Sequence, residues 1–128
     1  MIALVICNTH GLNIRIGRQL LRRYVIHTVG PVYRDGKHGE ADLLASAYRR
    51  SLEVAAAHGV TSIAFPSIST GAYRFPIAHA ARIALQTAVA GLRAHSHIAL
   101  VRFVLFSAAD LATYEAALAE VAAAPPAA

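Results

Sequence analysis

Residues 61–76, with the sequence TSIAFPSISTGAYRFP, hold the residue types of this chain that could bind an anion. A short apolar run ends at Phe65, small hydroxyl residues and Gly71 follow, and a helical pattern begins at Pro76. Backbone N–H groups at a helix N-terminus lack partners, and the helix dipole adds partial positive charge there. Gly71 lets the backbone turn and lets a ligand approach closely. This pattern predicts a phosphate-binding loop, although an ordinary strand-to-helix turn also uses Ser and Thr as helix caps.

The segments around this loop alternate between strand and helix patterns. Strand patterns cover residues 24–29, 61–65 and 98–106, and helical patterns cover residues 40–58, residues 76–91 and a segment that follows the capping box of Ser107 and reaches Val121. Residues 1–6 form either a short strand or a frayed lead-in. This alternation predicts the α/β class, with a mostly parallel sheet and helices on both faces. Right-handed crossovers then bring the loops at residues 30–39, 67–75 and after 106 to one edge, where ligands of such sheets bind.

The composition is that of one soluble domain. The chain has 128 residues, of which 56% are hydrophobic and 15% charged, so disorder is excluded. Its single cysteine, Cys7, excludes an internal disulfide and fits a reducing cytosol. No zinc-ligand spacing is present, and we predict neither a metal site nor a cofactor. Residues 1–7 are apolar but too short for a bilayer span of about 20 residues, which predicts a cytoplasmic protein without membrane contact.

The charge of the chain favours an anionic partner. The formal net charge is +5, but the arginines are scattered along the sequence instead of forming one dense patch. A small anionic ligand explains this charge with fewer assumptions than nucleic acid, which remains the second possibility. His27 lies within an apolar strand pattern and is interpreted as a structural residue rather than a catalytic one.

Three of these segments resemble the macro domain, an ADP-ribose-binding module, in its bacterial branch that removes acetyl or ADP-ribosyl groups. They read YVIHTVGPVYRDGKHGE, SIAFPSISTGAYRFP and RFVLFSAADLATYE, at residues 24–40, 62–76 and 102–115. The match runs in register from about Cys7 to Leu118, and the second segment is the most specific. The resemblance implies a three-layer αβα sandwich around a mixed, mostly parallel sheet.

The resemblance also implies roles for particular residues. The family's loop that wraps the diphosphate and the distal ribose corresponds to Ser69, Thr70, Gly71, Ala72 and Tyr73. Its backbone amides hold the phosphates, and Tyr73 lies beside the distal ribose, where it is the one residue assigned near the chemistry. Phe106 stands where the family packs adenine. The implied partners are ADP-ribose, O-acetyl-ADP-ribose and ADP-ribosylated proteins.

The chain departs from the family pattern before residue 24. Nothing there corresponds to the family's adenine-reading acid, its ribose-binding asparagine or its glycine-rich loop with a catalytic aspartate. The family's CPTGxA stretch appears as CNTHGL from Cys7, Leu21 replaces a usual proline, and Arg74 replaces a second loop glycine. The bulk of Arg74 would crowd a phosphate, whereas its charge would attract one.

We interpret these departures as an N-terminally truncated macro domain. Residues 1–23 are then an irregular lead-in, residues 24–121 the C-terminal two-thirds of the domain, and residues 122–128 a disordered tail. Loss of a central strand would expose sheet edges and allow self-association. Residues 1–6 could cover one such edge as a substitute strand.

Three functions remain open from the sequence. The first is an ADP-ribose site, with or without hydrolysis of esters at the distal ribose. Hydrolysis is expected to be weak, because a general base must reach the attacking water and Asp35, Asp42 and Asp110 are not at the family's position. The second is a non-catalytic module that binds ADP-ribose or nucleic acid. The third is a remnant without function.

Overall fold

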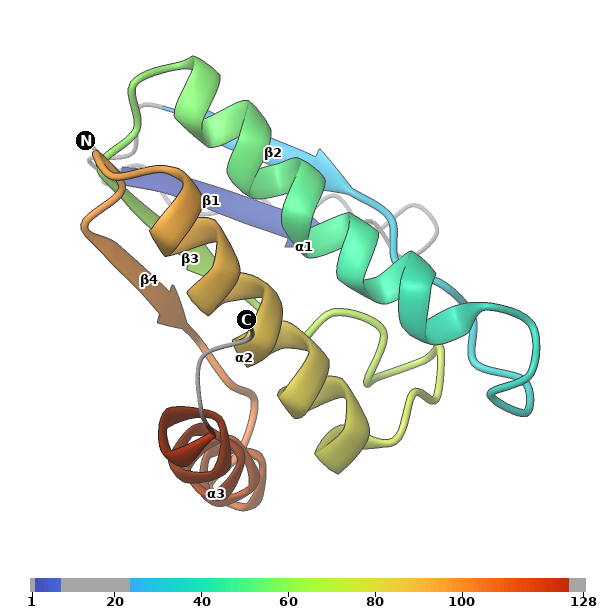
Figure 1. The fold of residues 1–128 in the computed structure, drawn as a ribbon. Helices are drawn as coiled ribbons and strands as arrows, with labels where there is room; N and C mark the ends of the chain where they lie inside the picture. Colours follow the sequence, from blue (N-terminus) through green and yellow to red (C-terminus); the bar gives the residue numbers. More distant parts are fainter. Residues whose placement is uncertain (1, 8–23, 125–128) are drawn as a thin grey trace.

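The computed structural model describes the backbone strand at residues 2–7 and all of residues 24–124. The sheet contains the strands β1 (Ile2–Cys7), β2 (Tyr24–Thr28), β3 (Ser62–Phe65) and β4 (Leu100–Phe103), and the helices are α1 (Glu40–Ala57), α2 (Ile77–Ala94) and α3 (Ala108–Ala123). The strand order is β2-β1-β3-β4, and neighbouring strands run parallel (Figure 1). The α/β class predicted from the sequence is confirmed. Because the strands run in one direction, their carboxyl ends share one edge.

The first strand is an interior strand of this sheet. Ala3 is paired with Tyr24 of β2, and Leu4 is paired with Ala64 of β3. The first residues therefore do form a strand that covers an edge, as expected, but this strand covers an edge of β2 and an edge of β3 together. The segment expected as an irregular lead-in thus begins with a regular strand. An interior strand satisfies the backbone donors and acceptors of both neighbours, which an edge position cannot do. The remainder of that lead-in, residues 8–23, lies outside the described residues.

The three helices lie on one side of the sheet. Figure 1 shows α1 and α2 side by side across the strands, and α3 packs against α2 beyond β4. A row of aromatic rings connects these elements: Tyr48 of α1 lies 5.1 Å from Phe65 of β3, and Phe103 of β4 lies 5.8 Å from Phe65 and 5.3 Å from Tyr114 of α3. Offset aromatic pairs of this kind stabilise a core beyond their buried area.

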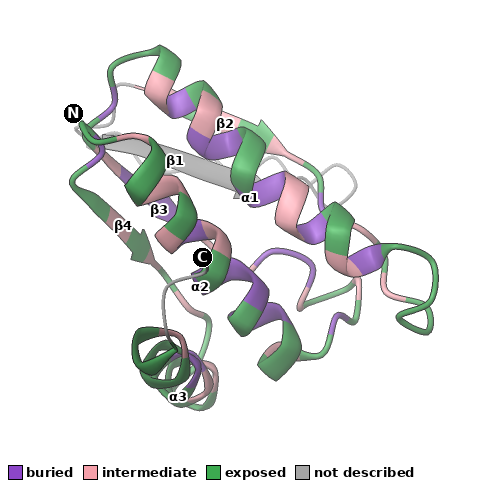
Figure 2. Ribbon diagram, viewed as in Figure 1, coloured by how far each residue is buried: buried purple, intermediate pink, exposed green. Residues whose placement is uncertain are grey.

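The opposite face of the outer strands is exposed. Side chains of β2 and β4 alternate between half-buried and exposed, and Val25 and Leu100 are among the exposed ones. Val104, directly after β4, is exposed as well. The nearly continuous apolar run of residues 98–106 is typical of a strand covered on both faces, but β4 is covered on one face only, so the expectation from this pattern is wrong. The described residues make up the sheet and one helical layer, in which α1 and α2 carry continuous buried stripes while α3 is mostly exposed (Figure 2).

Two glycines were expected to end helices, and only one of them does so. α1 stops before Gly59, which adopts φ 70° as expected for a C-terminal stop. Gly91, predicted as the end of α2, instead lies inside that helix. A Cβ at this position would lie 2.5 Å from Cδ1 of Leu52, so the glycine is needed for the close approach of α1 and α2.

The helix starts also differ from one another. Pro76 precedes α2 rather than opening it, since the helix begins at Ile77. The capping box before α3 is confirmed, because Ser107 Oγ accepts a hydrogen bond of 3.1 Å from the Asp110 N–H. α3 continues to Ala123, into the segment predicted as a disordered tail, and residues 125–128 lie outside the described residues. Within the described residues no helix is long and apolar enough to cross a bilayer.

Candidate functional site

Three loops meet at the carboxyl edge of the sheet, as the alternation of elements predicts. The Tyr33 N–H, in the loop after β2, donates a 2.8 Å hydrogen bond to the Tyr73 carbonyl, in the loop after β3. Ser67 Oγ lies 2.8 Å from the hydroxyl of Tyr114, which connects that second loop to α3. The residues assigned to a ligand site from the sequence therefore lie on neighbouring loops.

A buried tyrosine holds the beginning of the loop after β3. The Tyr48 hydroxyl accepts a 3.0 Å hydrogen bond from the Ile68 N–H and donates one of 3.3 Å to the Pro66 carbonyl. In the helical pattern of residues 40–58, Tyr48 by itself indicates only core packing. A tyrosine rather than a phenylalanine at a fully buried helix position is the signal that could have indicated this second role, because a buried hydroxyl needs partners.

In the part of the chain that the structure describes, the loop presents a row of backbone donors without acceptors. Two hydrogen bonds within the loop fix its backbone. The Arg74 N–H donates to the Gly71 carbonyl at 3.0 Å, and the Phe75 N–H donates to the Ser69 carbonyl at 2.9 Å. Among the described residues, by contrast, nothing accepts a hydrogen bond from the N–H groups of residues 69–72. Successive amides of this kind form a concave site for an anion.

Ser69 combines backbone strain with an unsatisfied polar atom. Its φ is 66°, in the left-handed region that non-glycine residues avoid at about 1–2 kcal/mol. The residue is 5% exposed, and its Oγ has no hydrogen-bond partner among the described residues. Such features gather at ligand sites, because the surrounding structure must hold them in place for a purpose other than stability.

Gly71 does not make the turn, contrary to the sequence interpretation. Its φ is outside the left-handed region, and a Cβ added to it would find nothing within 4 Å. The residues with positive φ in this loop are Ser69 and Arg74, and neither is a glycine. The openness around Gly71 is compatible with the close approach of a ligand, which stays a prediction.

Arg74 stands where the resemblance places a second glycine, and its φ of 61° gives the physical reason for that glycine. We predict that Arg74→Gly stabilises the protein by about 1 kcal/mol relative to Arg74→Ala, because only glycine adopts this conformation without steric penalty. Chemical denaturation of both variants measures the difference. Equal stability of the two variants would show that the left-handed backbone carries no strain.

Phe106 lies in the loop between β4 and α3 and is 99% exposed. A fully exposed aromatic ring offers a flat surface on which a base can stack. The predicted contact of Phe106 with adenine is compatible with this exposure and stays a prediction. His27 is exposed on β2, and its interpretation as a structural residue also stays a prediction.

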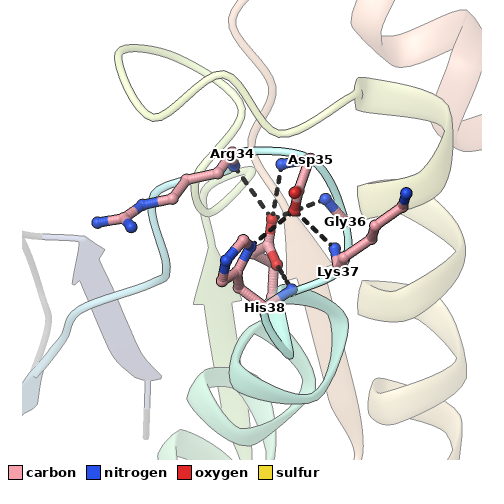
Figure 3. Close-up of polar contacts among 6 residues, drawn as sticks. Arg34, Asp35, Gly36, Lys37 and His38 are labelled. Atoms are coloured by element: carbon pink, nitrogen blue, oxygen red, sulfur yellow. Dashed lines mark hydrogen bonds and ion pairs between the residues drawn. The ribbon is translucent and has the colours of Figure 1, made fainter.

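A buried glutamate shapes the loop after β2, and the sequence analysis missed this role (Figure 3). Glu40 is 2% exposed; its Oε2 accepts hydrogen bonds from the N–H groups of Arg34, Asp35 and Gly36, and its Oε1 accepts one of 2.6 Å from His38. In the sequence, Glu40 is typical of an acidic residue in the first turn of a helix. The paired glycines nearby, Gly36 and Gly39, were the available signal of a tightly wound loop.

The same carboxylate argues against a metal at this position. The ligand atoms of Asp35, His38 and Glu40 lie within 4.8 Å of one another, which is suitable spacing for a cation. Both oxygens of Glu40 already accept backbone N–H groups, however, and those donors would repel a cation. We therefore interpret the group as the means by which the loop is held beside Tyr33.

Acid is expected to weaken this loop. Hydrogen bonds from the Arg34 N–H and the neighbouring amides lower the pKa of Glu40 from 4.5 to about 2. Because the pKa is lower in the folded state, the stabilisation is complete above about pH 4.5 and disappears as the pH falls toward 2. We predict that Glu40→Gln lowers the melting temperature at pH 7, and that the difference from wild type shrinks between pH 4.5 and 2. Thermal unfolding across this range measures it, and a constant difference would contradict the prediction.

The elements and loops described above define an α/β domain whose parallel strands end beside a row of backbone amides. The family model described as "Macro domain" matches residues 4–84. The chain belongs to the macro domain family.

Two curated relatives illustrate the similarity. A macro domain-containing protein of Chlorobaculum tepidum is 50% identical over 113 residues, which are 88% of this chain and 66% of that protein. An O-acetyl-ADP-ribose deacetylase of Escherichia fergusonii is 45% identical over 114 residues, which are 89% of this chain and 64% of that protein. The chain thus spans slightly less than two-thirds of the length of these relatives.

Solved macrodomain structures also match this chain. A mutant Oceanobacillus iheyensis macrodomain with ADPR (ADP-ribose) matches at a TM-score of 0.72 and 43% identity, over 77% of this chain and 52% of that one. The Trypanosoma brucei macrodomain in complex with ADP-ribose matches at a TM-score of 0.67 and 38% identity, over 74% of this chain and 39% of that one.

Proposed function

We propose that this protein binds ADP-ribose or a closely related nucleotide, with the diphosphate on the N–H groups of residues 69–72. The observation that supports this most strongly is the row of four backbone amides for which the described residues provide no acceptor, together with the left-handed φ and the unpaired Oγ of Ser69 among those same residues. Phosphate oxygens are acceptors only, and they complement such a row of donors.

The relatives support the identity of the ligand. Structural neighbours at 38–43% identity carry ADP-ribose. In the proposed pose Tyr73 lies beside the distal ribose and Phe106 stacks on adenine, as the family resemblance implies. The exposed ring of Phe106 and the amide row both belong to loops at the carboxyl edge of the sheet, so one extended nucleotide could contact both.

Calorimetry with ADP-ribose, ADP, adenosine and a short RNA tests this proposal. We expect ADP-ribose to bind more tightly than adenosine, because adenosine lacks the diphosphate. Nucleic acid is the competing ligand, and its binding would decrease steeply with added salt as counterions are released. Absence of ADP-ribose binding, or tighter and strongly salt-dependent binding of RNA, would overturn the proposal.

Hydrolysis is a second candidate, because some relatives are named O-acetyl-ADP-ribose deacetylases. A general base must reach the attacking water, and among the described residues the buried carboxylate at this edge is Glu40, which already accepts four N–H groups. We therefore propose binding with little turnover. Acetate release from O-acetyl-ADP-ribose measures turnover, and rapid release that is lost in Tyr73→Ala would contradict this assignment.

A further inference from the structure

A chain of hydroxyl groups connects α3 to the amide row. The Tyr114 hydroxyl lies 2.8 Å from Ser67 Oγ, and Thr70 Oγ1 donates to that same oxygen at 2.9 Å and to the Ser67 carbonyl at 3.1 Å. Thr70 is a member of the amide row. The position of its backbone therefore depends on a residue more than forty positions later in the sequence.

Tyr114 is also the main attachment of α3. It is 4% exposed and, with Ala117, is one of the two buried residues of that helix, whereas Leu111 and Leu118 are about half exposed. Its ring contacts Phe103. Burial raises the pKa of Tyr114, so the hydroxyl stays protonated and able to donate at neutral pH. Because α3 begins directly after the loop that carries Phe106, the same side chain controls both ends of the proposed site.

We propose that Tyr114 is a positioning residue whose hydroxyl, through Ser67, fixes the amide row of residues 69–72 relative to Phe106. This inference deepens the proposed function and rests on it for the identity of the ligand. A nucleotide that uses both the amide row and the aromatic ring needs the two at a set separation, and preorganisation of that separation increases affinity. A ligand that uses the ring alone does not.

The variant Tyr114→Phe tests the proposal, because it keeps the ring against Phe103 and removes the hydroxyl. We expect affinity for ADP-ribose to fall about tenfold, the typical effect of one lost hydrogen bond, with adenosine affinity unchanged. Leu118→Ala is the matched control on the same helix, since it alters a half-exposed side chain without touching the hydroxyl chain, and it should leave both affinities unchanged. Equal losses for ADP-ribose and adenosine in Tyr114→Phe would overturn the proposal, because they indicate general displacement of α3.

A double-mutant cycle separates positioning from simple stability. Ser67→Ala breaks the contacts that pass through Ser67, while the hydrogen bond between the Tyr114 and Tyr48 hydroxyls remains. The loss of ADP-ribose affinity in the double variant Tyr114→Phe, Ser67→Ala should therefore be smaller than the sum of the two single losses. Additive losses would contradict a connected chain.

Amide hydrogen exchange in the free protein makes the test independent of any ligand. Tyr114→Phe should accelerate exchange of the Arg74 and Phe75 amides, which are bonded within the loop, by about tenfold. The amides of α1 should not change. Unchanged loop exchange would overturn the positioning role even if ADP-ribose binds, whereas accelerated exchange without ADP-ribose binding would overturn only the proposed function.

Discussion

Gly71→Glu is expected to abolish ADP-ribose binding while leaving the fold intact. The side chain would project from a position where a Cβ finds nothing within 4 Å, so the loop itself has room for it. A carboxylate there would lie beside the amide row and oppose the diphosphate. Two like charges about 4 Å apart repel by about 4 kcal/mol at an effective dielectric constant near 20, which corresponds to a loss of roughly a hundredfold to a thousandfold in affinity. Calorimetry with ADP-ribose measures this loss.

Two further variants divide the effect into its causes. Gly71→Ala adds a methyl group in open space and should bind nearly as wild type does, while Gly71→Gln adds the bulk of glutamate without its charge. We expect affinity to decrease in the order Ala, Gln, Glu, with equal melting temperatures for the three. Wild-type affinity in Gly71→Glu would show that residues 69–72 are not the phosphate site.

Gly30→Ala is expected to disturb the same site from the other side. A Cβ at this buried glycine would lie 2.1 Å from Ser69 Oγ and 2.4 Å from Cγ2 of the fully buried Ile68. Both side chains are buried, so we expect the loop after β3 to shift. Overpacking of this kind costs about 1–3 kcal/mol of stability. We expect that loss in denaturant unfolding, together with at least about a tenfold loss in affinity for ADP-ribose.

A second-site variant checks the cause of this destabilisation. Ser69→Gly removes the closest clashing atom and also relieves the left-handed strain of that residue. The double variant Gly30→Ala, Ser69→Gly should therefore recover part of the lost stability. If Gly30→Ala matched wild type in both stability and affinity, close packing of Gly30 against Ser69 would be irrelevant to the site.

Much of the fold follows from local patterns. The apolar periodicity and the Ser107 capping box predict the helices to within a few residues, and the alternation of elements predicts a parallel sheet with its loops at one edge. The helix end at Gly91 was wrong because a glycine that stops a helix and one that allows two helices to touch look the same in a sequence. Only the position of Leu52 distinguishes the two.

The residues of the candidate loop, from Ser69 to Tyr73, could also be selected from the sequence, since small hydroxyl residues between a strand and a helix suit an anion. The features that make this loop suitable for a ligand could not be predicted from the sequence. The N–H groups without acceptors among the described residues, the left-handed φ of Ser69 and its unpaired hydroxyl depend on contacts with distant positions. The Tyr48 hydroxyl bonds the Ile68 N–H, and Gly30 packs closely against Ser69.

The sequence by itself determined the kinds of elements, their order and the chemical nature of the loop, because those depend on near neighbours along the chain. Only the tertiary structure decided the interior place of β1, the single covered face of β4, and the contacts that hold the loop. The physical reason is that pairing, burial and hydrogen-bond satisfaction are properties of residues that meet in space. In a helical pattern, Glu40 is an ordinary acidic residue of the first turn. In the folded protein it accepts four backbone N–H groups and holds the preceding loop.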